Sequence, residues 1–250
     1  MSQASDETTS DVTTKRLGAR TTTASAAGFA EMAAAIHNED TVEQTVELIL
    51  RFALTALQCG YAGVSLRRGR GIETIASTDE LVAGLDELQL ELDEGPDIDL
   101  ISDRVGVLVT DIRHESRWPR WSSRVAKAGI RSMLGARLYT DKETVGTLNL
   151  YDPSPNRFDL EDQAVAQIFA RHAAIALSQA QETANLWHAI DARKRIGQAQ
   201  GILMERYDLS EDQAFQVLLR YSQSNNIKLR LVAEQLITTR DLPGGSPAQV

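Results

Sequence analysis

The sequence contains little of what covalent or cofactor chemistry usually requires. Among its 250 residues there is one cysteine, Cys59, so no disulfide can form within the chain. The four histidines are scattered, and no cysteine or histidine pair has the spacing of a zinc site, so we expect neither a metal nor a cofactor. Aromatic residues make up only 5% of the chain, which disfavours proteins that bind carbohydrate by ring stacking.

Long apolar runs are also missing. No stretch approaches the roughly 18 apolar residues that a membrane-spanning helix needs, and residues 1–20 lack the apolar centre of a signal peptide. The chain has no glycine-rich phosphate loop, no nucleophile elbow and no paired catalytic motif. Together with the single cysteine, these absences predict a non-enzymatic protein of the cytoplasm.

The charge of the chain is unevenly distributed. The net charge is −9, yet residues 193–240 contain eight basic and five acidic residues, so the rest of the chain is strongly acidic. A basic segment on an acidic carrier is typical of a unit that binds a polyanion such as nucleic acid. An excess of three charges is equally compatible with a solvated surface, so charge alone does not decide between the two.

The pattern of apolar residues predicts helices on both sides of a group of strands. Helices are expected at 29–37, 42–58, 81–90 and 122–128, and strands at 62–68, 71–77, 106–112, 132–140 and 144–152. The last two strands read as a hairpin. This order predicts an α+β fold with a mainly antiparallel sheet flanked by helices. The Ser- and Thr-rich residues 1–27 are expected to be disordered, and the tail 241–250 to be flexible.

A helical pattern begins near Asp159 and continues to residue 196 without glycine or proline, which predicts one long helix linking two domains. Within it, small and apolar residues step by three and four, the spacing of a two-helix seam: Ala173, Leu177, Ala180, Ala184 and Trp187. Two interpretations remain open. The stripe pairs with a second copy of the chain in a homodimer, or it packs inside its own domain.

The run RIGQAQGILMERYDLSEDQAFQVLLRYSQSNNIKLRLVAEQLI, residues 195–237, resembles the ANTAR domain, a three-helix module of transcription antitermination regulators. The resemblance is carried by Ala199-x-Gly201-x-Leu203-Met204-x-Arg206, followed by Leu209-Ser210, Ala214-Phe215, Lys228-Leu229 and Val232-Ala233.

The residues of this run also predict three helices on physical grounds. Ser210 and Gln213 have the spacing of a capping box. The third helix is amphipathic, because its apolar residues follow one face: Leu229, Val232, Ala233 and Leu236. Met204 is expected to fill the core of the module.

The resemblance implies that the module binds hairpin loops in nascent RNA and stabilises a form that prevents terminator formation. Arginine can bind phosphate through two hydrogen bonds and can stack on an unpaired base. The side chains expected outside the core, and therefore the candidates for RNA binding, are Arg193, Lys194, Gln198, Arg206, Arg220, Lys228 and Arg230. A DNA-binding regulator and a protein-interaction module remain alternatives, because short helices serve either purpose.

The preceding region resembles a GAF domain, a small sensor fold, through GIRSMLGARLYTDKETVGTLNLYDPSPNRF (129–158) and EGPDIDL (94–100). The two resemblances imply a sensor domain over 28–182 and an ANTAR domain over 183–240. GAF domains commonly hold a small ligand between the sheet and its loops, here 94–121. The candidate ligand-binding residues are Asp97, His114 and Trp118. Asp97 and Asp99 can bind a cation or an amine, although acidic loop residues are more often simply solvated.

Overall fold

The structure is a computed structural model that describes residues 34–36, 39, 41–69, 71–102 and 106–241. The segment predicted to be disordered, 1–27, lies outside these residues, as do all but Asp241 of the tail predicted to be flexible, 241–250, and most of the helix expected at 29–37. The chain divides into two units, 1–181 and 182–250. None of the helices in the described part of the chain is long and apolar enough to cross a lipid bilayer.

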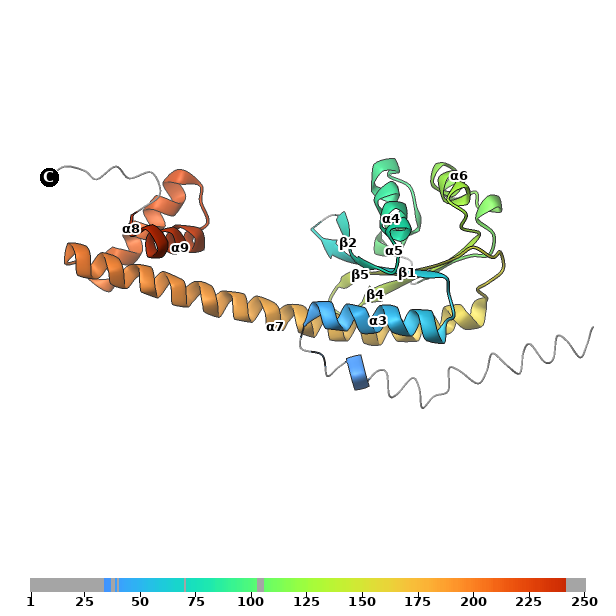
Figure 1. The fold of residues 1–250 in the computed structure, drawn as a ribbon, viewed down its shortest axis with the longest axis horizontal. Helices are drawn as coiled ribbons and strands as arrows, with labels where there is room; N and C mark the ends of the chain where they lie inside the picture. The colour runs from blue at the N-terminus through green and yellow to red at the C-terminus, as the bar shows by residue number, and fades with distance from the viewer. Residues whose placement is uncertain (1–33, 37–38, 40, 70, 103–105, 242–250) are drawn as a thin grey trace, which may run out of the picture. The chain divides into compact units, whose positions relative to one another are not determined.

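A five-stranded sheet forms the centre of the first unit (Figure 1). Its strands are β1 (Tyr61–Arg68), β2 (Gly71–Ser77), β3 (Gly106–Val109), β4 (Ser132–Tyr139) and β5 (Thr144–Asp152). They lie in the order β2-β1-β5-β4-β3, and every neighbouring pair is antiparallel. The predicted α+β fold with a mainly antiparallel sheet is therefore confirmed. Strand β3 is shorter than expected because Asp111 caps the 3-10 turn η1 (Ile112–His114).

Helices cover both faces of this sheet (Figure 1). One face is covered by α3 (Val42–Ala56) and the first part of α7 (Leu160–Tyr207). The other face is covered by α4 (Glu80–Leu92), α5 (Pro96–Ser102) and α6 (Pro119–Lys127). Helix α5 was not expected from the sequence. It begins at a proline, whose fixed backbone suits the first helical turn.

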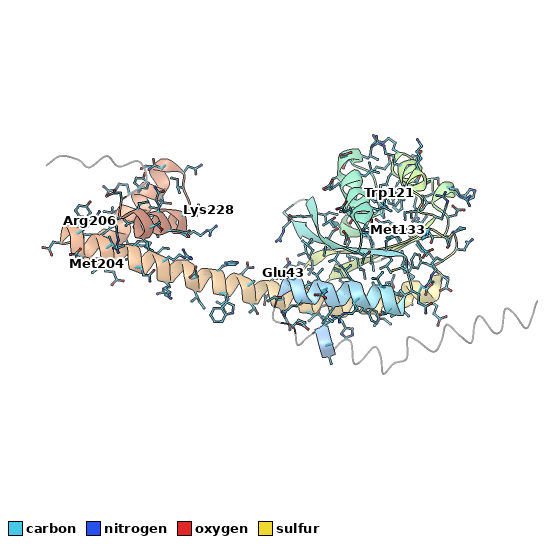
Figure 2. The ribbon with its side chains drawn as sticks, viewed as in Figure 1. Glu43, Trp121, Met133, Met204, Arg206 and Lys228 are labelled. Carbon is cyan, nitrogen blue, oxygen red and sulfur yellow. The ribbon has the colours of Figure 1, made fainter. Side chains whose placement is uncertain are left out.

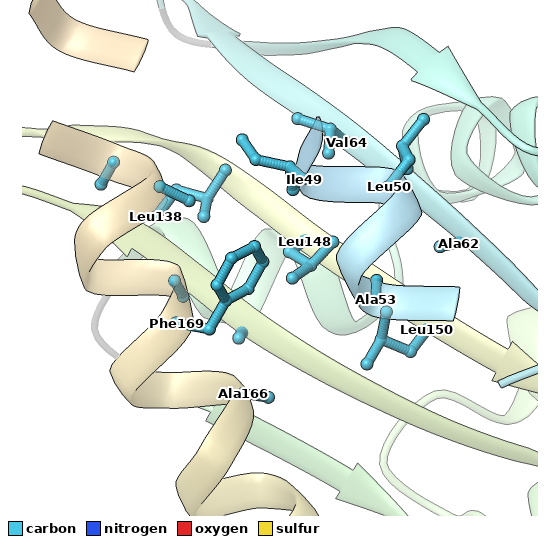
Figure 3. Packing of buried hydrophobic residues seen from close by; sticks show 14 of the residues in the cluster. Ile49, Leu50, Ala53, Ala62, Val64, Leu138, Leu148, Leu150, Ala166 and Phe169 are labelled. Atoms are coloured by element: carbon cyan, nitrogen blue, oxygen red, sulfur yellow. The ribbon is translucent and has the colours of Figure 1, made fainter. Parts of the chain in front are cut away.

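The core beneath the sheet is aliphatic and aromatic. Figure 3 shows Ile49 of α3 and Phe169 of α7 lying against Leu148 of β5. The rings of Phe169 and Phe52 have centroids 4.2 Å apart. Alanines fill the positions of α7 nearest the sheet, so the helix backbone can approach the strands closely. This core accounts for the stable attachment of α3 and α7 to the sheet.

Helix α7 is continuous through both units, as predicted: residues 160–181 belong to the first and 182–207 to the second. The first three residues of the expected two-helix seam, Ala173, Leu177 and Ala180, are buried inside the first unit. Ala184 is half-buried and Trp187 is 66% exposed. The seam therefore packs within its own unit over most of its length, which corrects the idea that the whole stripe is open to a partner.

The second unit is a three-helix module, as expected. It consists of the end of α7, α8 (Glu211–Asn225) and α9 (Leu229–Thr239). The capping box of Ser210 and Gln213 is present at the start of α8. The buried residues come from all three helices: Ala199, Leu203, Ala214, Leu218, Val232, Ala233 and Leu236. Met204 is 37% exposed, so the prediction that it fills this core was wrong.

Candidate functional site

Two carboxyl groups are buried between the sheet and the helices α4 and α5. Asp86 of α4 is 5% exposed and Asp97 of α5 is 2% exposed. Asp86 faces the sheet because it shares the buried side of α4 with Val82 and Gln89. On β5, Asn149 and Tyr151 alternate with leucines that face the other core, so their side chains meet the two carboxyl groups. Three elements, α4, α5 and β5, thus supply one polar cluster.

Hydrogen bonds connect all members of this cluster. The Nδ2 group of Asn149 donates to both oxygens of Asp97, at 2.9 Å each, and lies 3.4 Å from Asp86 Oδ1. The hydroxyl of Tyr151 donates to Asp86 Oδ1 at 3.0 Å, and Thr74 donates to Asp86 Oδ2 at 3.1 Å. Gln89 donates to Asp97 Oδ2 at 3.0 Å. All of these hydrogen-bond donors are uncharged amide or hydroxyl groups. Among the described residues, no cationic side chain forms an ion pair with either carboxyl group.

Burial without a cation disfavours the charged forms of both acids. Removal from water, followed by the proximity of Asp97, raises the pKa of Asp86 to about 7. Removal from water also raises the pKa of Asp97 above its ordinary value. The same burial, together with the nearby acids, raises the pKa of Tyr151. At neutral pH the pair therefore holds at least part of a proton and forms an acidic site that a cation would stabilise.

A cavity of about 310 Å³ opens onto this pair. Its polar wall includes Asp86, Asp97, Thr74 and Ser65, and its apolar wall is made by Ile72, Ala83 and Leu90. Glu73 and Glu87 add two further carboxylates, whereas no lysine or arginine of the described chain lines it. The volume is at the lower end of the range for small-molecule sites.

The other two candidate ligand residues lie apart from this cavity. His114 is 80% exposed in its side chain and contacts Asp111 at 3.4 Å. Trp118 is buried in the apolar cluster of α6, edge-on to Trp121, whose position Figure 2 shows. Of the three candidates, the structure places only Asp97 at the cavity. The single cysteine is buried as expected, and burial raises the pKa of the Cys59 thiol to about 12.

The second unit presents exposed cations. Arg193, Lys194, Arg220, Lys228 and Arg230 are exposed, and none of them has an ion pair with an acid among the described residues. Lys194 and Gln198 are four residues apart and therefore share one side of α7. Arg195, the neighbour of Lys194 on α7, and Arg230 of α9 line one groove of about 490 Å³. Lys228 and Arg230 lie at the start of α9, and Lys194 and Gln198 lie on an exposed side of α7.

The remaining basic residues of the module are placed differently. Arg195 contacts both Asp191, at 2.9 Å, and Glu234, at 2.7 Å, so its charge is balanced within the module. Arg206 donates to the backbone carbonyl of Arg240, and Figure 2 shows it at the opposite end of the module from Lys228. Arg220 lies on α8. Arg206 and Lys228 thus lie at opposite ends of the module, so the seven candidate RNA-binding residues are not gathered in one place.

Comparison with known families decides what the two units are. A family model of the GAF domain matches residues 41–177, and a model of the ANTAR domain matches residues 184–237. The chain belongs to the GAF family and carries an ANTAR domain. GAF and ANTAR domains are sensory and regulatory domains, so the chain is a sensor-regulated ANTAR regulator. No curated protein matches it.

Solved structures show the same GAF fold at low sequence identity. The GAF domain of a phosphoenolpyruvate-protein phosphotransferase from Coxiella burnetii is 15% identical and has a TM-score of 0.50, over 62% of this chain and 93% of that chain. A bacteriophytochrome from the photosynthetic bacterium R. palustris is 10% identical and has a TM-score of 0.53, over 70% of this chain and 41% of that chain. At these identities the likeness concerns the fold alone.

Sequence reasoning missed most of the polar cluster that contains Asp97. It named Asp97 but not Asp86, Asn149 or Tyr151, which lie 11 to 54 residues away in sequence. A signal was present in β5, where Thr147, Asn149 and Tyr151 alternate with leucines. Such alternation is usually read as a solvent-facing side. Here α4 and α5 cover that side, so the polar residues are buried.

Proposed function

We propose that this protein is a transcription antitermination regulator of the cytoplasm, in which the GAF domain senses a signal and the ANTAR domain binds hairpin loops of nascent RNA. The GAF domain holds a small ligand in the cavity beside Asp86 and Asp97.

One observation carries the RNA-binding proposal. Lys194, Lys228 and Arg230 are exposed on the ANTAR domain and have no ion pair with an acid among the described residues. Side-chain cations that are not paired within the protein are free to neutralise phosphates and release counterions. Gln198 adds a group that can donate to and accept from a base edge, on the same side of α7 as Lys194. An acidic protein that keeps these cations unpaired has a surface suited to a polyanion.

The first experiment compares nucleic acids. The full-length protein is titrated with an RNA hairpin that has an unpaired loop, and with duplex DNA of equal length, at several salt concentrations. We expect tighter binding to the hairpin, because side chains can stack on and hydrogen-bond to unpaired bases. Equal affinity for both, with the same salt dependence, would reduce the interaction to nonspecific charge. A clear preference for duplex DNA would favour the DNA-binding alternative instead.

The second experiment tests the residues. The double variant Lys194→Ala/Arg230→Ala is expected to bind the hairpin at least about tenfold more weakly, because it removes two phosphate contacts. A matched control, Arg51→Ala/Arg124→Ala, removes two exposed cations from the GAF domain and should leave RNA affinity unchanged. Equal losses in both double variants would show that net charge, not this surface, governs binding. Circular dichroism checks that helicity is retained.

We further propose a homodimer through α7. The part of the predicted seam that stays exposed is its end, where Trp187 adjoins two other large apolar residues, Leu186 at 62% and Ile190 at 50% exposure. Apolar side chains on one helix are covered efficiently by the same helix of a second copy. Light scattering should show a dimer that Trp187→Glu converts to a monomer. A monomer in the unmodified protein, with and without RNA, would contradict the proposal.

A further inference from the structure

We propose that the ligand of the GAF cavity is a small alkylammonium compound, whose protonated amine lies between the carboxyl groups of Asp86 and Asp97 and whose methylene chain lies against Leu90, Ile72 and Ala83. This inference rests on the proposed sensing role of the GAF domain and specifies its ligand class.

The charge of the cavity wall selects a cation. Four carboxyl groups line the cavity, those of Asp86, Asp97, Glu73 and Glu87, and no lysine or arginine of the described chain does. Glu73 is paired with Arg68 at the exposed rim, at 3.2 Å, but neither buried aspartate has a cationic partner among the described residues. An anionic ligand would be repelled, and a neutral one would leave two buried acids uncompensated.

The hydrogen bonds of the cluster select a cation that donates N–H groups. The carboxamide of Asn149 is fully buried and its Nδ2 group contacts both aspartates, yet its Oδ1 atom accepts no hydrogen bond. A buried carbonyl oxygen without a donor is unfavourable. An ammonium group can donate three hydrogen bonds, enough for both aspartate carboxylates of the cavity wall. The carboxamide thus supplies an independent sign that a donor is missing from the cluster.

A metal ion fits these groups less well than an organic cation. No group of three or more His, Cys, Asp or Glu side chains in the described ranges is arranged to hold a metal. The cavity also continues from the carboxyl groups to an apolar wall, which a bare ion would leave uncovered. An aliphatic chain buries that wall, and a volume of about 310 Å³ accommodates a compound of a few carbons.

The test uses calorimetric titration of the full-length protein at neutral pH with 1,4-diaminobutane and agmatine as probes. We expect dissociation constants of about 1 mM or tighter, and no binding of 1,4-butanediol, which has the same chain without charge. Tetramethylammonium, a cation without N–H groups, should bind at least about tenfold more weakly than the diamine because it cannot donate hydrogen bonds. Equal binding of the diol or of tetramethylammonium, or no binding of either amine, would overturn the proposal.

Variants assign the binding to this cavity. Asp97→Asn should weaken diamine binding at least about tenfold, and Asp86→Asn provides a second variant in case the first one folds poorly. Glu91→Gln is the matched control, because Glu91 is an exposed carboxylate of the same helix α4 outside the cavity. Thermal unfolding of each variant shows whether it is folded. Unchanged binding in folded Asp97→Asn and Asp86→Asn protein would overturn the assignment.

Two further measurements separate related explanations. Nα-acetyl-lysine amide carries the same amine on a peptide-like unit, and tighter binding of it than of the diamine would identify a lysine side chain rather than a free small molecule. RNA binding is measured on the same preparation. Amine binding without RNA binding would contradict the proposed function of the ANTAR domain alone, whereas RNA binding without amine binding would contradict only this inference.

Discussion

The two domains differ in whether their unpaired ionisable side chains are buried or exposed. The GAF domain buries the carboxyl groups of Asp86 and Asp97, whereas the ANTAR domain exposes Lys194, Lys228 and Arg230, and among the described residues none of these five side chains forms an ion pair. A buried uncompensated charge reduces the stability of the fold unless a ligand supplies the missing charge. An exposed unpaired charge has little effect on stability and is available to a large partner. This contrast supports the two proposals made above, a small cationic ligand for the GAF domain and a polyanion for the ANTAR domain.

The largest expected effect concerns the core that holds the GAF domain together. Phe169→Ala should lower the free energy of unfolding of the GAF domain by about 3–5 kcal/mol, because it empties a fully buried site next to Phe52. Denaturant unfolding followed by the fluorescence of the buried Trp118 and Trp121 measures this change. The neighbouring Ile168 is 56% exposed, and Ile168→Ala should change stability by less than about 0.5 kcal/mol. Equal effects would place Phe169 outside the core.

The next largest effect is the pH dependence of the free energy of unfolding that the buried Asp86 should cause. The folded pKa of Asp86 is about 7 and its ordinary value is 3.8, so the folded state binds more protons than the unfolded state between these values. The free energy of unfolding should therefore fall as pH rises from about 4 to 7, by roughly 2 kcal/mol between pH 5 and 8. Asp86→Asn should flatten this dependence, and Glu91→Gln should preserve it. A stability that rises over this range would show that the aspartates are compensated.

A smaller effect tests a single free cation of the ANTAR domain. Lys194→Ala should weaken binding of hairpin RNA to a similar extent for different loop sequences and reduce the slope of log affinity against log salt by about one, as expected for the loss of one phosphate contact. Fluorescence anisotropy at several salt concentrations measures both quantities. An unchanged slope would remove Lys194 from the interface.

The smallest effect is expected at the adjacent arginine. Arg195 contacts both Asp191 and Glu234, so its charge is already balanced and Arg195→Ala should change RNA affinity by less than about twofold. The direct comparison with Lys194→Ala in the same assay isolates the effect of internal pairing, because the two residues are neighbours in sequence. A larger loss for Arg195→Ala would contradict the distinction between paired and unpaired cations.

Local patterns in the sequence predicted most of the fold. The hairpin of β4 and β5, the uninterrupted helix α7 and the capping box at Ser210 depend on neighbouring residues, and each is present. Helix α5 was missed because its seven residues are too few to show a helical period. The exposure of Met204 was missed because the side of α7 that faces α8 and α9 depends on tertiary packing.

The cavity was less predictable than the fold for a physical reason. Its polar residues come from β1, β2, α4 and α5, and only the folding of the sheet beneath the helices brings them together. Asp97 could be singled out because it lies in EGPDIDL (94–100), which carries the resemblance to a GAF domain, but its partner Asp86 lies inside an ordinary helix. For the ANTAR domain the exposed basic residues could be named in advance, whereas the pairing of Arg195 required the position of Glu234 on α9.

The most direct test of the central claim is photochemical crosslinking of a bound RNA hairpin to the full-length protein, followed by mass spectrometry of the crosslinked peptides. The account predicts crosslinks in the peptides that contain Lys194 and Gln198 and those that contain Lys228 and Arg230. Crosslinks confined to the GAF domain, or to the opposite end of the ANTAR domain around Arg206 and Arg240, would contradict it.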